Sequence, residues 1–282
     1  MWSTQGEVIA ARRCVTLNRQ AQCFGIEETI VLVNVGTKET QELRLDPESS
    51  RSTSGFPVAW SIDGMSLVVG VGEAAEVTDT ESPFYSYHYI VYDLPTGTYI
   101  DLPADVTPIG WNKHDNRILV DKPSSNGLLE MAWFDLEDMG FEVVGVVERE
   151  EGYFGRFALS PNLQFVLLSD SPFESTCSEL RSYPLADLVQ SSVFLSLACF
   201  PAWSPDGNRL AYAAKDNPQA EPNQIMIADA GGSSPNSLFG DQLVPFLGYP
   251  TWSPDGTRIA FTQGPQGGNA VYVAELPEIL RP

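Results

Sequence analysis

The chain has 282 residues, 43% of them apolar, so it can bury a sizeable core rather than remain disordered. Its 37 acidic and 16 basic residues give a net charge of −21, which repels phosphate backbones and anionic lipid and makes nucleic acid and bare membrane poor partners. No apolar run approaches the roughly 18 residues of a membrane span. No signal peptide is visible at Met1, so a secreted form would be a mature or trimmed chain.

The clearest local pattern is a hairpin that occurs twice, as CFPAWSPDGNRLAYAA at 199–214 and GYPTWSPDGTRIAFTQ at 248–263. In SPDG at 204–207, the proline presets φ, the aspartate suits the third position, and the glycine accepts a positive φ, as a tight turn requires. A short run ending in tryptophan precedes the turn, and a β-prone apolar run follows it. The pattern therefore predicts a β-hairpin.

The same frame recurs along the chain. Weaker copies are VAWSIDGMSLVVGVG, IGWNKHDNRILV and FALSPNLQFVLL, and the chain opens in frame with MWSTQGEVIAA. The anchor positions are spaced by 58, 51, 48, 44 and 49 residues and include five of the six tryptophans. The anchors are Trp2, Trp60, Trp111, Leu159, Trp203 and Trp252. We interpret them as wedges between stacked repeats rather than as repeated binding sites.

Each hairpin is followed by a third apolar strand, expected in chain order at 29–36, 87–97, 131–140, 179–188, 224–232 and 270–276. Fourth strands are predicted at QELRL, TYIDLP, FEVVGVV and SVFLSL, and PEILRP at 277–282 is a thin candidate for the last outer strand. Four antiparallel strands in roughly 45–55 residues make a propeller blade. We expect one all-β domain, a six-bladed β-propeller of four-stranded blades in which a terminal blade can be incomplete. The expected blades are 1–50, 51–103, 104–150, 151–197, 198–243 and 244–282.

The repeats AWSPDGNRLAYAA…QIMIADA and TWSPDGTRIAFTQ…AVYVAEL resemble the TolB-like β-propeller repeat, found in the periplasmic TolB protein and in the propellers of prolyl-oligopeptidase-type enzymes. The match is strong over 199–276, fair over 58–140, and weak over 1–50 and 156–198. The N-terminal domain of TolB has no counterpart here. The resemblance implies a partner bound at the propeller mouth, in the cell envelope. Because the motif residues build the blade, they specify the fold rather than the function.

Strand alternation places the longer loops on one rim, whereas the SPDG turns of the opposite face are minimal, so we expect the long-loop rim to be the functional face. Its aromatic residues either contact a peptide or sugar, or pack under the loops and plug the channel. Its acidic residues favour a cationic partner. The candidate binding residues are Phe56, Tyr85, Tyr153, Phe154, Phe173, Phe200, Tyr249, Glu148, Glu150 and Glu151.

The four cysteines fall into two topological pairs. Cys14 and Cys23 flank the loop before the first repeat's third strand, and Cys177 and Cys199 fall on the same rim of adjacent blades. We expect disulfides Cys14–Cys23 and Cys177–Cys199, which favour a periplasmic or extracellular location. Free buried thiols are the alternative. No Cys-x-x-Cys motif or Cys/His cluster supports a structural zinc site.

No catalytic motif is present. His88 is interpreted as a packing residue and His114 as a turn residue, and there is no nucleophile elbow, phosphate loop or H-E-x-x-H. We therefore expect a non-enzymatic propeller that binds a protein or peptide of basic character, with no cofactor and no metal site. A cation held in the channel by backbone oxygens would be invisible in the sequence. The alternatives are a carbohydrate-binding or polysaccharide-processing propeller, and the substrate-gating propeller of a larger prolyl-oligopeptidase-type hydrolase.

Overall fold

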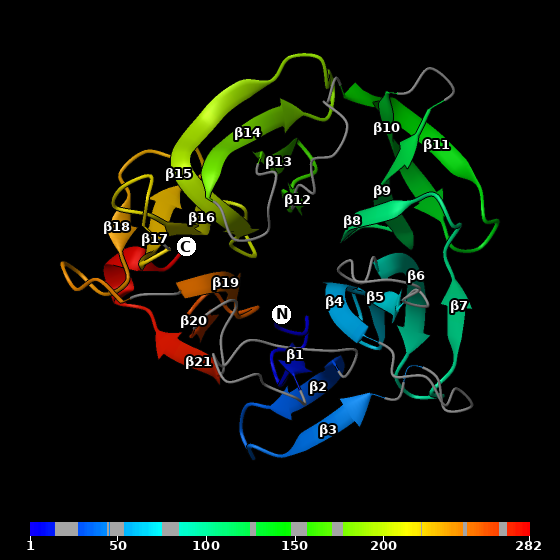
Figure 1. Cartoon of the computed structure of the whole chain (residues 1–282), viewed down its shortest axis with the longest axis horizontal. Helices are drawn as coiled ribbons and strands as arrows, with labels where there is room; N and C mark the ends of the chain where they lie inside the picture. The colour runs from blue at the N-terminus through cyan, green and yellow to red at the C-terminus, as the bar shows by residue number, and fades with distance from the viewer. Residues whose placement is uncertain are drawn as a thin grey trace, which may run out of the picture. The chain divides into compact units, whose positions relative to one another are not determined.

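The computed structural model describes residues 1–14, 28–43, 45, 54–74, 85–124, 128–147, 157–170, 177–220, 222–244, 247–264 and 270–282. The chain divides into two compact parts, Met1–Pro108 and Ile109–Pro282. Over these stretches the regular structure is antiparallel β-strand, apart from one short 3₁₀ helix near the C-terminus (Figure 1).

The N-terminal part contains two sheets whose strands follow one another in chain order. The first sheet is β1 (Val8–Cys14), β2 (Glu28–Asn34) and β3 (Thr40–Leu43). The second sheet is β4 (Ser54–Trp60), β5 (Ser66–Ala74), β6 (Tyr85–Asp93) and β7 (Tyr99–Asp101). Ile30, Leu67 and Ile90 lie fully buried in a core that both sheets build.

The C-terminal part contains three sheets, again with strands in chain order. The first is β8 (Thr107–Trp111), β9 (Arg117–Pro123), β10 (Leu129–Asp135) and β11 (Phe141–Val147). The second is β12 (Phe157–Leu159), β13 (Phe165–Asp170), β14 (Ser178–Pro184), β15 (Ser192–Trp203), β16 (Arg209–Ala214), β17 (Gln224–Asp229) and β18 (Asn236–Ser237). The third is β19 (Leu247–Trp252), β20 (Arg258–Gln263) and β21 (Ala270–Glu275).

The seven-stranded sheet forms because β15 belongs to two repeats. The first half of β15 pairs with β14 and the second half with β16. The register shifts between Cys199 and Ala202, close to the expected blade boundary at 197/198. One 12-residue strand therefore acts both as the outer strand of one repeat and as the inner strand of the next. The number of blades and their exact limits stay predictions.

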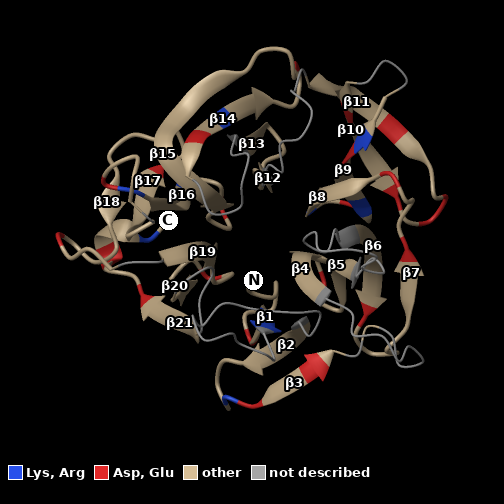
Figure 2. Cartoon of the chain, in the orientation of Figure 1, with Lys and Arg blue, Asp and Glu red and all other residues tan. Residues whose placement is uncertain are grey.

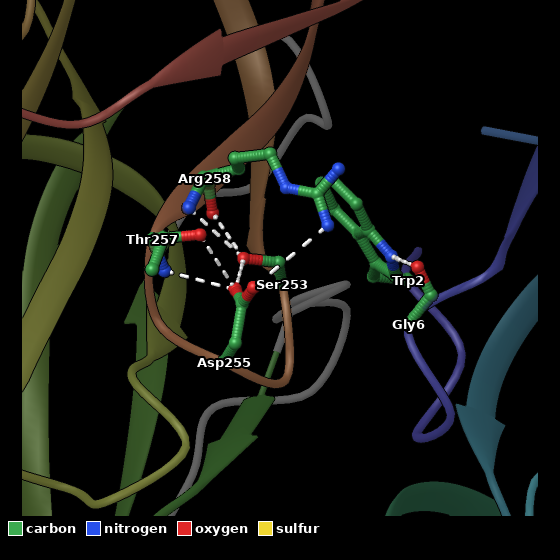
Figure 3. A network of polar contacts seen from close by, with 6 residues as sticks. All are labelled: Trp2, Gly6, Ser253, Asp255, Thr257 and Arg258. Atoms are coloured by element: carbon green, nitrogen blue, oxygen red, sulfur yellow. Dashed lines mark hydrogen bonds and ion pairs between the residues drawn. The ribbon is translucent and has the colours of Figure 1, made fainter. Parts of the chain in front are cut away.

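The predicted hairpin turns are built around a buried serine. Ser61, Ser204 and Ser253 lie directly after anchor tryptophans and are at most 6% exposed. Each hydroxyl accepts the backbone N–H of the residue five positions later, at 2.8–2.9 Å, and donates to the aspartate two positions later. The turn glycines have φ of 68–76°, the left-handed region that glycine enters at little cost. Figure 3 shows the Ser253–Asp255 network, whose polar groups are satisfied within the turn.

The anchor tryptophans join neighbouring repeats through main-chain contacts. The indole Nε1 of Trp60 donates to Met1 O, that of Trp203 to Ala158 O, and that of Trp252 to Ala202 O, at 3.0–3.4 Å. In each case the acceptor is the residue just before the anchor of the preceding repeat. Trp2 differs, because its Nε1 donates to Gly6 O in its own turn. Leu159, whose side chain has no N–H, lies close to Gly110, where an added Cβ would be 3.1 Å from Leu159 Cβ.

The C-terminal segment corrects one expectation. PEILRP was a candidate outer strand, but Glu278–Leu280 form a 3₁₀ helix and 277–282 contain no strand. Pro277 precedes this helix, and Leu280, 4% exposed, inserts into the core that Trp252 and Leu276 share. Burial of Leu280 directs the segment inward. The strand order of this sheet accordingly ends at β21.

Candidate functional site

Two candidate aromatic residues meet in the inner strands of neighbouring repeats. Phe200 lies in β15 and Tyr249 in β19, and their rings stack with centroids 4.1 Å apart and planes 28° apart. Both side chains are partly exposed, and Phe200 also contacts Gly248. β19 packs against β15 and β16, which fixes this juxtaposition. Each member of the pair lies within its strand, three residues before the anchor tryptophan Trp203 or Trp252.

The backbone at both residues is strained. Phe200 has φ of 53° and Tyr249 has φ of 52°, a region that costs a bulky L-residue roughly 1–2 kcal/mol. Both lie in β-bulges, because two residues of β15 or β19 face one residue of the next strand. The bulge turns the two rings toward one another. The surrounding sheet holds them in a conformation that an isolated strand would not adopt.

A disulfide lies directly beside this pair. Cys199 immediately precedes Phe200 and is bonded to Cys177, with Cα atoms 4.7 Å apart. Both cysteines are at most 5% exposed. The Cys177–Cys199 disulfide expected from the sequence is thus present, and it fixes the chain at the start of the Phe200 bulge. The expected Cys14–Cys23 pair lies outside the described residues and stays a prediction.

Phe56 occupies a different environment. Its ring lies over Gly70, where an added Cβ would be 2.4 Å from Phe56 Cζ. Tyr87 and Tyr89 contact the same ring edge-on, with centroid distances of 5.5 and 6.3 Å. This is the packing alternative that the sequence left open. The two tyrosines were not predicted as partners, although their spacing of two in YSYHYIVYD indicates a shared face.

The other candidate positions are not brought together by the described structure. Tyr85 begins β6, but its side chain lies outside the description. The remaining candidates also lie outside the described residues, and their roles stay predictions: Tyr153, Phe154, Phe173, Glu148, Glu150 and Glu151.

In the C-terminal part, hairpin turns from separate repeats contact one another. Lys113 Nζ donates to Pro205 O at 3.0 Å, linking turns 92 residues apart. A Cβ at Gly207 would lie 3.6 Å from Pro161. Burial lowers the pKa of Lys113, while the nearby Asp206 carboxylate opposes that shift. Because these turns pack against one another, the long-loop rim stays the better candidate for ligand contact.

Acidic side chains lie on the last strand of four sheets, as Figure 2 shows for β3, β7, β11 and β21. Glu42, Asp101, Glu142 and Glu275 are exposed there. These four carboxylates lie in four separate sheets rather than in one group, and Glu42 and Glu142 form ion pairs with Arg13 and Arg117, respectively. These carboxylates contribute to a general negative field around the strands and do not form a discrete site.

Across the residues that the structure describes, no three His, Cys, Asp or Glu side chains are grouped as metal ligands. Over the same residues, no helix has the length and apolar character of a membrane span. His88 is partly buried and His114 exposed, as expected for a packing residue and a turn residue.

No family model matches the sequence, and no curated protein matches it. Solved structures do match. TolB from Acinetobacter baumannii has a TM-score of 0.65 at 14% identity over 97% of this chain, which spans 62% of that protein. The β-propeller domain of the trilobed protease from Pyrococcus furiosus gives 0.52 at 16% identity, covering 96% of this chain and 79% of that one. An oligogalacturonate lyase from Vibrio parahaemolyticus gives 0.52 at 14% identity, covering 98% and 72%.

These matches establish the architecture. At identities of 14–16% they show the fold alone, and the fold is a β-propeller of the TolB-like kind. The all-β fold and the TolB-like resemblance expected from the sequence are confirmed. The proteins matched include a TolB, a protease domain and a lyase, so the fold by itself selects no activity.

Proposed function

We propose that this TolB-like β-propeller is a non-enzymatic scaffold that binds a basic protein or peptide segment at its long-loop rim. The observation that carries the proposal is the Phe200–Tyr249 stack, held half-buried at two strained bulges. Rigid aromatic side chains at a rim are typical anchors of peptide-binding surfaces. The strain is compensated by the surrounding sheet, which is common where geometry serves binding.

Charge determines the kind of partner. With a net charge of −21, the protein attracts cationic segments and repels acidic ones. The likeness to a chain from a mitotic checkpoint complex, which is a protein assembly, supports the same choice. The Cys177–Cys199 disulfide supports an oxidising compartment, so we place the protein in the periplasm or outside the cell.

The test uses a labelled 12-residue peptide rich in Lys and Arg, titrated with the intact chain and followed by fluorescence anisotropy. We expect Phe200→Ala and Tyr249→Ala each to weaken binding about tenfold, as loss of an aromatic anchor does. Tyr99→Ala is the matched control, because Tyr99 is 43% exposed on the outer strand β7. Thermal unfolding of each variant checks that the fold is retained.

Two further measurements test the charge argument. Added salt should weaken binding, and the triple change Glu148→Gln, Glu150→Gln, Glu151→Gln should do the same at low salt. An acidic peptide of equal length should not bind. Equal affinity of the wild type and of both aromatic variants for the basic peptide would contradict the proposal, as would peptide binding that does not depend on salt concentration.

Other functions can use the same rim. The likeness to an oligogalacturonate lyase favours a polysaccharide as the second candidate, and aromatic stacks also bind sugar rings. A glycan-array signal that disappears in Tyr249→Ala would favour that candidate. The likeness to a protease propeller raises a third, a substrate-gating propeller, which a catalytic domain encoded in the same gene would support.

A further inference from the structure

The third strand of the last repeat differs from its counterparts in the other repeats. In β21, Val271, Tyr272 and Val273 are 40%, 45% and 40% exposed. Val271 lies opposite Thr262 of β20, and Thr262 is ten positions after the anchor Trp252. The residues at that same position in β2, β10, β14 and β17 are at most 1% exposed: Ile30, Met131, Leu180 and Ile225. β21 is thus exposed where four of the five equivalent strands are buried, and the fifth residue, Tyr89 of β6, is partly buried.

The difference arises at the outer edge of the sheet. β2, β6, β10, β14 and β17 each pair with an outer strand, whereas the order β19-β20-β21 ends at β21 among the described strands (Figure 1). Tyr89 and Ile225, at the position of Val271, accept N–H groups from Leu102 and Leu238 at 2.8 Å. No described strand supplies such a donor to Val271.

Strand alternation identifies which groups face the open edge. Leu276 N–H donates to Thr257 O, so the main chain of Leu276 is directed toward β20. Successive residues of an antiparallel strand alternate in this direction. The N–H and C=O groups of Val271 and Val273 are therefore directed away from β20. A row of such groups on an exposed apolar strand is a template for a further strand.

We propose that the outer edge of β21 binds an extended, leucine-containing, basic segment of a partner protein as an added antiparallel strand. This inference goes beyond the rim function proposed above and uses a separate surface. Main-chain pairing supplies affinity, and the side chains on the two faces supply selectivity.

The chain's own outer strands indicate what fits. Facing the position of Val271, four of the five outer strands carry leucine: Leu43, Leu102, Leu195 and Leu238. Leu43 and Leu102 are each 4% exposed, and Leu195 and Leu238 are partly buried, so this position covers a leucine side chain at least in part. A leucine in the docked segment would cover the exposed valines of β21 in the same way.

Charge favours a cationic partner over a second copy. Glu275 and Glu278 are exposed at the C-terminal end of β21. Two chains that each carry −21 repel one another, and pairing β21 with itself would place two such ends on one small sheet. A segment with Lys or Arg near Glu275 gains attraction instead.

The experiment uses a labelled peptide of residues 97–104, taken from the β7 region, carrying Thr98→Lys and Asp101→Lys. In the register of β7, residue 98 lies near the position of Glu275, and Leu102 lies opposite the position of Val271. The control peptide is identical except for N-methylation at Leu102, which keeps charge and side chain but removes the N–H donor. We expect saturable binding of the first peptide to the intact chain and at least about fivefold weaker binding of the second.

Protein variants locate the contact. Val273→Pro removes an outward N–H without touching the β20 pairing and should weaken binding at least about fivefold. Val271→Lys should weaken it also, whereas Val189→Lys, an equal charge change at a 73% exposed turn residue, should not. Hydrogen exchange at 270–275 should slow when the peptide binds. The Tyr249→Ala protein should bind this peptide as the wild type does. This test therefore stays valid even if the function proposed for the rim is wrong.

Some outcomes would overturn the inference. These are absence of binding, equal binding of the N-methylated peptide, or equal binding by Val273→Pro and wild type. A concentration-dependent dimer of the chain that Val273→Pro abolishes would assign the edge to a second copy instead.

Discussion

Ser253 has no exposed surface, yet its hydroxyl is fully used within five residues of chain. It donates to Asp255 and accepts the N–H of Arg258, while Asp255 also accepts the N–H of Thr257 (Figure 3). The Ser253 hydroxyl, with the Thr257 groups, lowers the pKa of Asp255 to about 2. The ionised carboxylate is therefore part of the folded turn.

The first prediction concerns this carboxylate. Because its folded pKa lies below the ordinary value of 3.8, its contribution to stability is complete above that value and is lost as pH falls toward about 2. Asp255→Asn should lower the free energy of unfolding by about 1 kcal/mol at pH 7, a figure reduced for solvent screening. Urea unfolding of both proteins from pH 7 to pH 3 should show the difference shrinking below pH 4. A difference independent of pH would contradict the assignment.

At this scale the sequence predicts the turns but not the conformations of the aromatic pair. Proline, aspartate and glycine specify the turn locally. Phe200 and Tyr249 precede prolines, and a residue before proline is expected to be extended. Their positive φ arises from bulge pairing with β16 and β20, a tertiary effect that no neighbouring residue signals.

Among the elements, Gly70 makes room for the aromatic cluster of the N-terminal part. It lies in the middle of β5, where a glycine ordinarily weakens a strand. The Phe56 ring occupies the space where a side chain would be, between Tyr87 and Tyr89. The absence of a side chain is therefore a packing requirement.

Gly70→Ala should lower the free energy of unfolding by about 1–3 kcal/mol, because the new Cβ would overlap the Phe56 ring. Gly36→Ala is the control, since its nearest neighbour would be 3.4 Å away at Asn34 Oδ1 and its φ is not positive. Guanidinium unfolding of both variants measures the effect. Equal stabilities would show that the ring shifts freely.

Strand positions could be predicted well wherever apolar runs follow a turn. The third strands expected at 131–140, 224–232 and 270–276 begin within two residues of β10, β17 and β21. β18 has two residues and no apolar signal, so the sequence did not reveal it. PEILRP was wrong as a strand because the burial of Leu280 outweighs its local preference.

In the molecule as a whole, the disulfide adds a covalent link within the longest sheet. Cys177 and Cys199 are separated by 22 residues and join the start of β14 to the middle of β15. Restricting a loop of that length in the unfolded chain stabilises a fold by about 3 kcal/mol in the chain-entropy model. The disulfide therefore stabilises the fold as a whole and does more than hold the two cysteines together.

The double change Cys177→Ala, Cys199→Ala should lower the free energy of unfolding by about 3 kcal/mol and leave the fold intact. Chemical unfolding followed by tryptophan fluorescence measures the loss. Peptide mapping without reductant should recover Cys177–Cys199 and also test the predicted Cys14–Cys23 pair. A mass showing free thiols would remove the argument for an oxidising compartment.

The β-propeller fold could be predicted because its signal is repeated: six anchors at near-regular spacing require units that cover one another. The ligand could not be predicted from the sequence, because recognition depends on rim residues that differ from repeat to repeat. Phe200 and Tyr249 were among the candidates, but the stacking of their rings is seen only in the structure.

The hydrogen bonds of the serine–aspartate turn are made within one short segment of chain. The anchor indole needs only a main-chain carbonyl of the preceding repeat as its acceptor. Every backbone offers that carbonyl, whatever its side chains. A gene segment encoding one such hairpin can therefore be duplicated, and its copies can drift apart in sequence, without first evolving matched side chains for each new neighbour. Chains assembled from such repeats can keep their architecture after sequence similarity between the repeats has been lost.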